Sequence, residues 1–197
     1  MLSRAKTRDY LETRKSSSQE QMLADLFSLD AKLSTWAKCL PSSLTYSKSN
    51  LHEQLITMRQ PSYTLVHVLY HQCRLVLHAS LVPQFSGTAS QDSTPAEAVQ
   101  LSAQVALKSA QAVSDLAADV LALDWDPASL APFLGYSMYT AATVHLPFVV
   151  SRDQRLREKA RKHLTASLKL LKSMKPFWRN LDKLVSQSYI SGLGIYC

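Results

Sequence analysis

The stretch that decides the fold is PFLGYSMYTAATVHLP, residues 132–147. Its side chains are apolar on nearly every side of a helix, and a proline stands at each end. A helix that is apolar all round lies in the core of a protein or crosses a membrane. About 16 residues are too few for a membrane helix, which needs about 20. The sequence therefore predicts a central core helix over 132–147.

Amphipathic helices are predicted on both sides of this central helix, because apolar residues recur there at steps of three and four. The predicted helices cover residues 19–40, 61–82, 95–123 and 151–174, with a short segment at 177–185. No segment alternates polar and apolar residues with the period of a strand. The predicted fold class is all-α, with about six helices packed as one domain, residues 19–190, around the central helix.

The connections between these helices are predicted from their polar residues and prolines. Residues 1–18 are charged and poor in apolar side chains, so they are interpreted as a flexible basic arm. Residues 41–60 are interpreted as a polar connection, and residues 83–93, PQFSGTASQDS, as a disordered loop. Thr94 and Glu97 have the spacing of a capping box, which predicts that Thr94 caps the next helix.

The composition indicates which cellular compartment and which classes of protein are compatible with the sequence. The chain has 197 residues, enough for roughly one domain, and a formal net charge of +7. Cys39, Cys73 and Cys197 are odd in number and far apart, which argues against a disulfide framework and favours a reducing intracellular compartment. No secretory signal and no membrane span are expected. Motifs for a nucleophilic serine, a phosphate loop or a dinucleotide site are also absent, so no enzyme is predicted.

Three histidines lie on one face of the helix predicted over 61–82. His67, His71 and His78, together with Arg74, follow spacings of four, three and four residues. The favoured interpretation is a hydrogen-bonded polar seam within a packed helix. The alternative is a helical metalloenzyme in which His67 and His71 hold zinc, but Val68 stands where the usual motif has glutamate.

Hydroxyl side chains form a second stripe, on the central helix. Tyr136, Tyr139, Thr140 and Thr143 share one face. Buried hydroxyls need partners, so this face either bonds a neighbouring helix or lines a cavity for a small molecule. His145, on the opposite face, is predicted to be a core histidine with its hydrogen bonds satisfied.

The positive charge is concentrated in one helix. Residues 152–175 contain nine basic and two acidic side chains, a net charge of +7 that equals that of the whole chain. Arg155, Lys159, Lys162 and Lys169 lie opposite the apolar face of this helix. These four residues are a candidate anion-binding face that could follow nucleic-acid phosphates. The alternative is an ordinary solvated helix face.

Several motifs together resemble one family, the regulatory region of fungal transcription factors with a binuclear zinc cluster. TLVHVLYHQCRLVLHASLV, residues 64–82, is similar to the family's Leu-His-x-x-Tyr-His followed by Leu-His, although Ala79-Ser80 stands where Arg-Pro is frequent. APFLGYSMYTAATVHL, residues 131–146, resembles the family's Pro-Phe-x-Gly-Tyr segment. Residues 168–184, which include Trp178, and the segment from Trp36 to Pro41 complete the resemblance.

The resemblance implies a nuclear, α-helical domain that regulates transcription by sensing an effector or by contacting other proteins. The six-cysteine cluster that holds zinc and reads DNA is absent from these 197 residues, so no cofactor is expected in this chain. The chain is interpreted as the C-terminal part of a longer factor or as a truncated protein. Expected partners are transcription proteins, a small-molecule effector or a second copy of the chain, with DNA bound only through a domain that is not in this chain. His67, His71, His78, Tyr136 and Tyr139 are the candidate effector-facing surface, and nucleic-acid binding by residues 152–175 is the alternative function.

Overall fold

Helices alone build the part of the chain that the computed structural model describes, which is residues 2–57, 59–86, 94–123 and 125–190. The elements are α1 (Leu2–Lys38), η1 (Ser42–Leu44), α2 (Lys48–Ile56), α3 (Gln60–Ala79), α4 (Pro83–Ser86), α5 (Ala96–Ala122), η2 (Pro127–Ser129), α6 (Pro132–Val149), α7 (Gln154–Met174) and α8 (Leu181–Ile190). The all-α prediction is confirmed, with eight α-helices in these ranges, of which α4 is a single turn. None of the described helices has the length and apolar character needed to cross a membrane.

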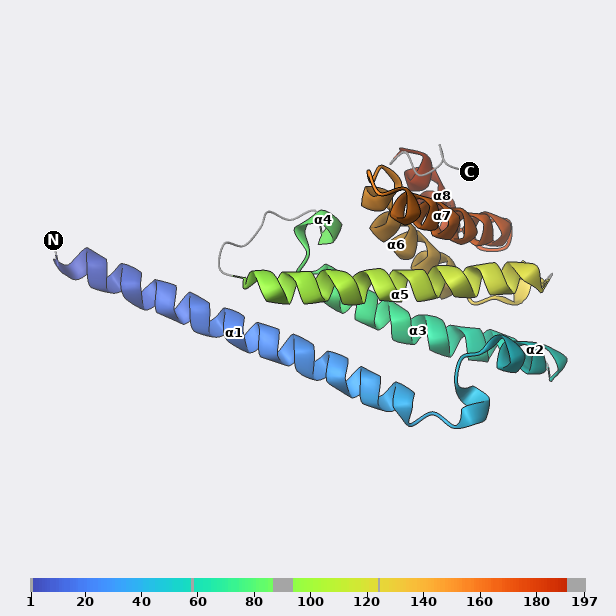
Figure 1. The fold of residues 1–197 in the computed structure, drawn as a ribbon, viewed down its shortest axis with the longest axis horizontal. Helices are drawn as coiled ribbons and strands as arrows, with labels where there is room; N and C mark the ends of the chain where they lie inside the picture. Colours follow the sequence, from blue (N-terminus) through green and yellow to red (C-terminus); the bar gives the residue numbers. More distant parts are fainter. Residues whose placement is uncertain (1, 58, 87–93, 124, 191–197) are drawn as a thin grey trace.

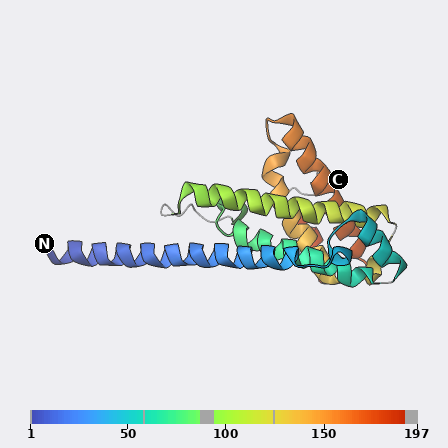
Figure 2. The same ribbon diagram turned by 60° about the horizontal axis from the view of Figure 1, so that its bottom comes forward.

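The helices form two groups. Figure 1 shows α1, α3 and α5 running side by side with alternating direction. The second group, α6, α7 and α8, packs across α5, as the turned view of Figure 2 shows. Helix α1 lies on the outside of the first group against α3, and its first half extends beyond the rest of the molecule (Figures 1 and 2).

Helix α6 lies in the core, as its all-round apolar sequence predicts. Leu134, Met138 and Ala141 are fully buried. On α5, the small residues Ala106 and Ala110 are also fully buried, which lets the neighbouring helices approach closely. The apolar face of α7 completes the core with further buried residues: Ala160, Leu164, Leu168 and Leu171.

One glycine sets the distance between α6 and its C-terminal neighbours. A Cβ atom on Gly135 would lie 2.6 Å from Leu181 Cδ1 and 3.3 Å from Leu171 Cδ1. The missing side chain therefore gives α7 and α8 the room to pack against the start of α6.

The N-terminal helix is longer than the sequence pattern predicted. The predicted helix begins at residue 19, but α1 begins at Leu2, so the stretch interpreted as a flexible arm forms the first half of a helix. The physical reason is composition, because residues 2–38 contain no proline or glycine and are rich in leucine, alanine, lysine and arginine, which favour helix. The sequence pattern therefore predicted the amphipathic part of α1 but not where the helix begins.

Two connections and one helix cap also differ from their predictions. The polar connection 41–60 contains α2, which Ser47 caps by accepting a hydrogen bond from the Asn50 backbone N–H. The predicted loop 83–93 begins with the helical turn α4, and residues 87–93 lie outside the described residues. The capping-box prediction for Thr94 is wrong, because Pro95 is the N-cap residue and the Thr94 hydroxyl accepts a 2.7 Å hydrogen bond from the Gln19 side chain.

Candidate functional site

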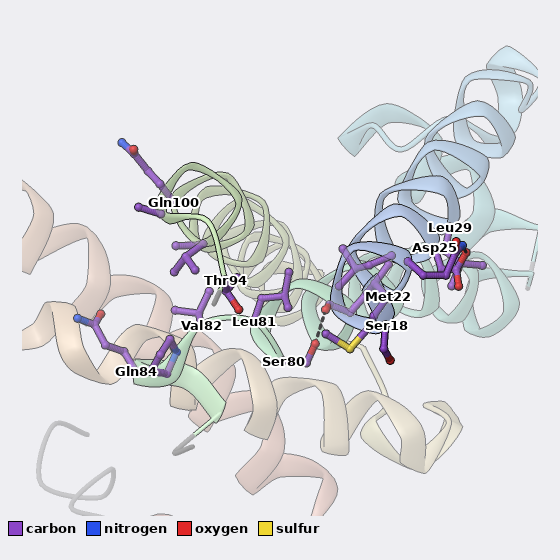
Figure 3. Close-up of a pocket in the computed structure, with 17 residues that line it drawn as sticks. Ser18, Met22, Asp25, Leu29, Ser80, Leu81, Val82, Gln84, Thr94 and Gln100 are labelled. Atoms are coloured by element: carbon purple, nitrogen blue, oxygen red, sulfur yellow. Dashed lines mark hydrogen bonds between the residues drawn. The ribbon is translucent and has the colours of Figure 1, made fainter. Parts of the chain in front are cut away.

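A cavity of about 1270 Å³ opens where α1 diverges from the end of α3 and the start of α5 (Figure 3). Apolar side chains from all three segments form most of its wall, with polar groups at intervals. Its lining residues are Ser18, Gln21, Met22, Asp25, Leu26 and Leu29 from α1, Leu77, Ser80, Leu81, Val82, Pro83 and Gln84 from the α3–α4 segment, and Thr94, Ala96, Val99, Gln100 and Ala103 from the start of α5. We call this space the α1 cavity. A cavity that is mostly apolar and carries a few polar groups is typical of sites for small molecules or for apolar side chains.

A polar cluster fastens α1 to the body beside this cavity. Asp30 of α1 accepts two hydrogen bonds from Arg74 of α3, at 2.6 Å from Nε and 3.0 Å from Nη2. His78 Nε2 lies 3.3 Å from the same carboxylate, and His78 Nδ1 lies 3.1 Å from Ser102 Oγ of α5. These four residues, which we call the Asp30 cluster, therefore join three helices.

Within the Asp30 cluster, Arg74 and His78 favour the ionised form of Asp30. Burial opposes ionisation of Asp30, but the hydrogen bond and charge of Arg74, together with His78, outweigh it and hold the pKa of Asp30 below its ordinary value. Burial lowers the pKa of His78, and the charge of Asp30 only partly offsets this. At neutral pH the cluster is therefore a carboxylate–guanidinium pair with a neutral histidine beside it.

Replacing Asp30 with asparagine is expected to destabilise the protein by about 1–3 kcal/mol, because the partly buried Arg74 loses its charged partner. Urea unfolding at pH 7 measures the change. Glu20→Gln is the control, since it also removes one negative charge and Glu20 is exposed on the same helix. Equal unfolding midpoints for the two variants would contradict a stabilising role for the Asp30 cluster.

The predicted histidine seam is divided between different neighbours. His78 belongs to the Asp30 cluster, whereas His67 contacts the segment before α2. Its Nε2 lies 3.0 Å from the Leu44 carbonyl oxygen, and its ring packs edge-on against Tyr46 and Tyr63. Burial, aided by the charges of His67 and Arg74, lowers the pKa of His71 to about 4. The hydrogen bonds that the favoured interpretation predicts are thus present at His67 and His78.

The predicted tyrosines lie on a separate part of the molecule. Tyr136 is 43% exposed, and its ring lies 5.9 Å from that of Phe133. Tyr139 is half-buried against the core. The hydroxyl stripe does bond a neighbouring helix, because Thr140 donates a 2.7 Å hydrogen bond to Gln72 of α3. None of the five residues predicted to face an effector is among the described residues that line the α1 cavity.

The predicted anion-binding face of α7 is exposed. Arg155, Lys159, Lys162 and Lys169 all have exposed side chains, and Lys159 donates a 3.0 Å hydrogen bond to Gln111 of α5. This arrangement fits both interpretations of the sequence, a phosphate-binding face and a solvated helix surface.

A second polar cluster lies in the core between α5, α6 and α7. Ser114 Oγ lies 3.0 Å from His145 Nε2 and 2.9 Å from Ser167 Oγ. The ring of His145 stacks on that of His163, and His163 Nε2 lies 3.1 Å from Asp115. Because Ser114 and His145 are fully buried, this serine–histidine pair satisfies core polar groups and has no surface at which a substrate could reach it. The prediction that His145 is a satisfied core histidine is confirmed.

The α1 cavity and the Asp30 cluster were not predicted from the sequence. A signal for Asp30 was available, since an acidic residue between Leu26 and Leu33 lies on the packed face of an amphipathic helix and requires a partner.

The zinc alternative for His67 and His71 finds no third ligand in the described ranges, where no group of three histidine, cysteine, aspartate or glutamate residues could hold a metal ion.

Comparison with known proteins identifies similar fungal transcription factors. The chain is 26% identical over 151 residues to the Zn(2)-C6 fungal-type transcription factor FTF1a of Fusarium oxysporum f. sp. lycopersici, a match that covers 76% of this chain and 14% of that protein. Two alignments with FTF1c of the same organism show the same identity and cover 71% and 79% of this chain. The chain thus spans only about one seventh of the length of these relatives. No family model and no solved structure matches it. The resemblance to fungal zinc-cluster transcription factors is confirmed.

Proposed function

We propose that this chain is a regulatory module of a fungal Zn(2)-C6-type transcription factor. It changes transcription in the nucleus through an effector or through protein contacts, and it catalyses no reaction. The observation that carries the proposal is the similarity to FTF1a and FTF1c over 71–79% of the chain. The helical fold supports it, because the two motif segments that resemble the family fall on α3 and α6, which pack against each other.

The α1 cavity is the better of the two candidate effector sites. His67 and His78 of the sequence-predicted surface are buried and already hydrogen-bonded. The α1 cavity, in contrast, is open, and its walls come from α1, the α3–α4 segment and α5. A ligand that contacts all three segments would bind best when α1 is docked, so its binding would shift the population of docked α1. Such a ligand would also raise the melting temperature of the chain.

A tethering experiment tests the regulatory role. The chain is fused to an unrelated DNA-binding domain and expressed in yeast with a reporter gene that carries the matching site. The proposal expects a change in reporter output, either activation or repression, relative to the DNA-binding domain alone. An expressed, nuclear fusion that leaves the reporter unchanged under varied nutrient conditions would contradict it.

DNA binding by the chain alone is expected to be weak, independent of DNA sequence and lost between about 50 and 200 mM salt. The reason is that Arg155, Lys159, Lys162 and Lys169 supply at most a few phosphate contacts. Fluorescence anisotropy of a labelled duplex measures this binding. Tight, sequence-dependent binding that survives at the higher salt and is abolished by R155E/K159E/K162E would instead favour the nucleic-acid-binding alternative, for which the exposure of this face is the supporting observation.

A further inference from the structure

A line of large apolar side chains on α1 faces solvent. Met22, Leu29 and Trp36 are 46%, 49% and 45% exposed, although each has a bulky apolar side chain. They are spaced seven residues apart, which places them in one line along the helix. Leu26 and Leu33, beside this line, turn toward the body and are buried and half-buried. Helix α1 therefore uses half of a coiled-coil-like stripe against its own chain and leaves the other half open.

Helix α3 extends this apolar surface. Val66, Leu69 and Val76 are exposed, as is Cys73, and their spacing of three and four residues again places them on one helix face. The two lines are neighbours, because the rings of Trp36 and Tyr70 are 5.9 Å apart, and Leu29 and Leu77 line the same cavity. On α3, Tyr70 and Leu77 stand three or four residues from Cys73 and therefore adjoin it. We call the combined surface the α1–α3 face: Met22, Leu29, Trp36, Val66, Leu69, Cys73 and Val76.

We propose that the α1–α3 face binds the same face of a second copy of this chain, with the two α1 helices antiparallel about a two-fold axis at Leu29. The charged residues of α1 favour a second copy of this chain as the partner. Asp25 stands four residues before Leu29 and Lys32 three residues after it, and both are exposed. An antiparallel pair brings Asp25 beside Lys32 of the partner subunit, with an offset of one residue, about 1.5 Å along the helix. A lysine side chain spans that offset.

The surface is self-complementary in its apolar residues as well. The same axis brings Met22 opposite the partner's Trp36, so one line of side chains serves both copies, as an isologous interface requires. A stable dimer buries about 800 Å² on each partner. Three side chains of α1 are too few for that area, and the adjoining residues of α3 enlarge it. The first half of α1, which extends beyond its own body in Figure 1, would run along the body of the partner in this arrangement.

Sedimentation equilibrium of the full chain, from about 1 to 100 µM, tests the proposal. The expected mass is twice the chain mass of 22.0 kDa. Leu29→Glu is expected to raise the dimer dissociation constant about tenfold or more, because it places a charge at the centre of the interface. Val150→Glu is the matched control, since Val150 is exposed and follows α6, a helix that is not part of this face. A wild-type chain that is monomeric throughout, or a dimer equally affected by both variants, would overturn the proposal.

Charge exchange separates a specific interface from a loss of folding. Asp25→Lys and Lys32→Asp are each expected to weaken the dimer, and the double variant is expected to restore it, because the ion pair is re-formed with its signs reversed. In a background with all three cysteines replaced by serine, Leu29→Cys is expected to form a disulfide between copies under mild oxidation, while Lys48→Cys forms none. Failure of the double variant to restore dimerisation, or equal cross-linking at both positions, would overturn the antiparallel pairing at Leu29.

Discussion

Lowering the pH from 7 to about 4 is expected to remove several kcal/mol from the free energy of unfolding. Burial, together with the charge of His163, lowers the pKa of His145 to about 3, and burial lowers that of His71 to about 4. In the unfolded chain both groups titrate near 6.5. Between these values the unfolded chain binds protons that the folded chain does not bind. Each such histidine therefore costs about 1.4 kcal/mol of stability for every pH unit below 6.5.

The sign of this effect is opposite to that of a surface histidine that gains an acidic partner on folding. The stabilising preference for neutral His71 and His145 is fully present above pH 6.5 and is lost as the pH falls toward 4 and 3. Asp30 adds little in this interval, because its lowered pKa places its loss of charge below the ordinary aspartate value of 3.8. The acid sensitivity between pH 6.5 and 4 thus comes from the buried imidazoles.

Urea unfolding at several pH values measures the slope, and His145→Gln identifies its source. Glutamine can keep a hydrogen bond to Ser114 but cannot take up a proton, so the variant is expected to lose less stability on acidification, by about 1.4 kcal/mol per pH unit. His52→Gln is the control, since His52 is exposed on α2. The same pH slope in wild type and His145→Gln would show that His145 does not carry the effect.

Replacing Leu134 with alanine is expected to destabilise the protein by about 2–5 kcal/mol. Leu134 is fully buried at the start of α6, so the substitution removes three buried carbon atoms, Cγ, Cδ1 and Cδ2, and leaves a cavity in the core. Gly135 beside it already lets Leu171 and Leu181 approach closely, so the surrounding side chains have little freedom to fill the space.

Thermal or urea unfolding measures the effect of Leu134→Ala against that of Leu101→Ala. Leu101 is 48% exposed on α5, so its truncation is expected to cost less than about 1 kcal/mol. Similar losses for the two variants would mean that α6 is not the centre of the core.

Local sequence patterns predicted the helices of the core but not the contacts that join them. The apolar character of residues 132–147 and the leucine spacing of α7 arise from burial, so both elements could be predicted with nearly their observed bounds. Helix α2 was missed because only Leu51 in it is buried, so its periodicity is weak. Its start was nevertheless marked by Ser47, a residue type that caps helices.

The candidate site could not be predicted for a different physical reason. Asp30 and Arg74 are 44 residues apart in sequence, and neither residue alone indicates the other as its partner. The three histidines of α3 share one helix face, as predicted. That face is long enough along the helix axis to contact different neighbours at its two ends. His67 thus meets Leu44, and His78 meets α1 and α5. Helix periodicity determines which residues share a face, while tertiary packing determines what each of them contacts.

The position of α1 on the outside of the fold has a consequence for the order in which the chain assembles. On the ribosome α1 is synthesised before α3, the helix that it packs against, and the end of α3 follows the end of α1 after roughly 2–8 s at ordinary rates of synthesis. The adjoining helices α6 and α7, in contrast, are close in sequence and can pair as soon as both emerge, since short chain separations close fastest. Helix α1 therefore cannot dock until α3 has followed it. Because α1 lies on the outside of the fold, its amide hydrogens are expected to exchange with solvent faster than those of α6 in the finished protein.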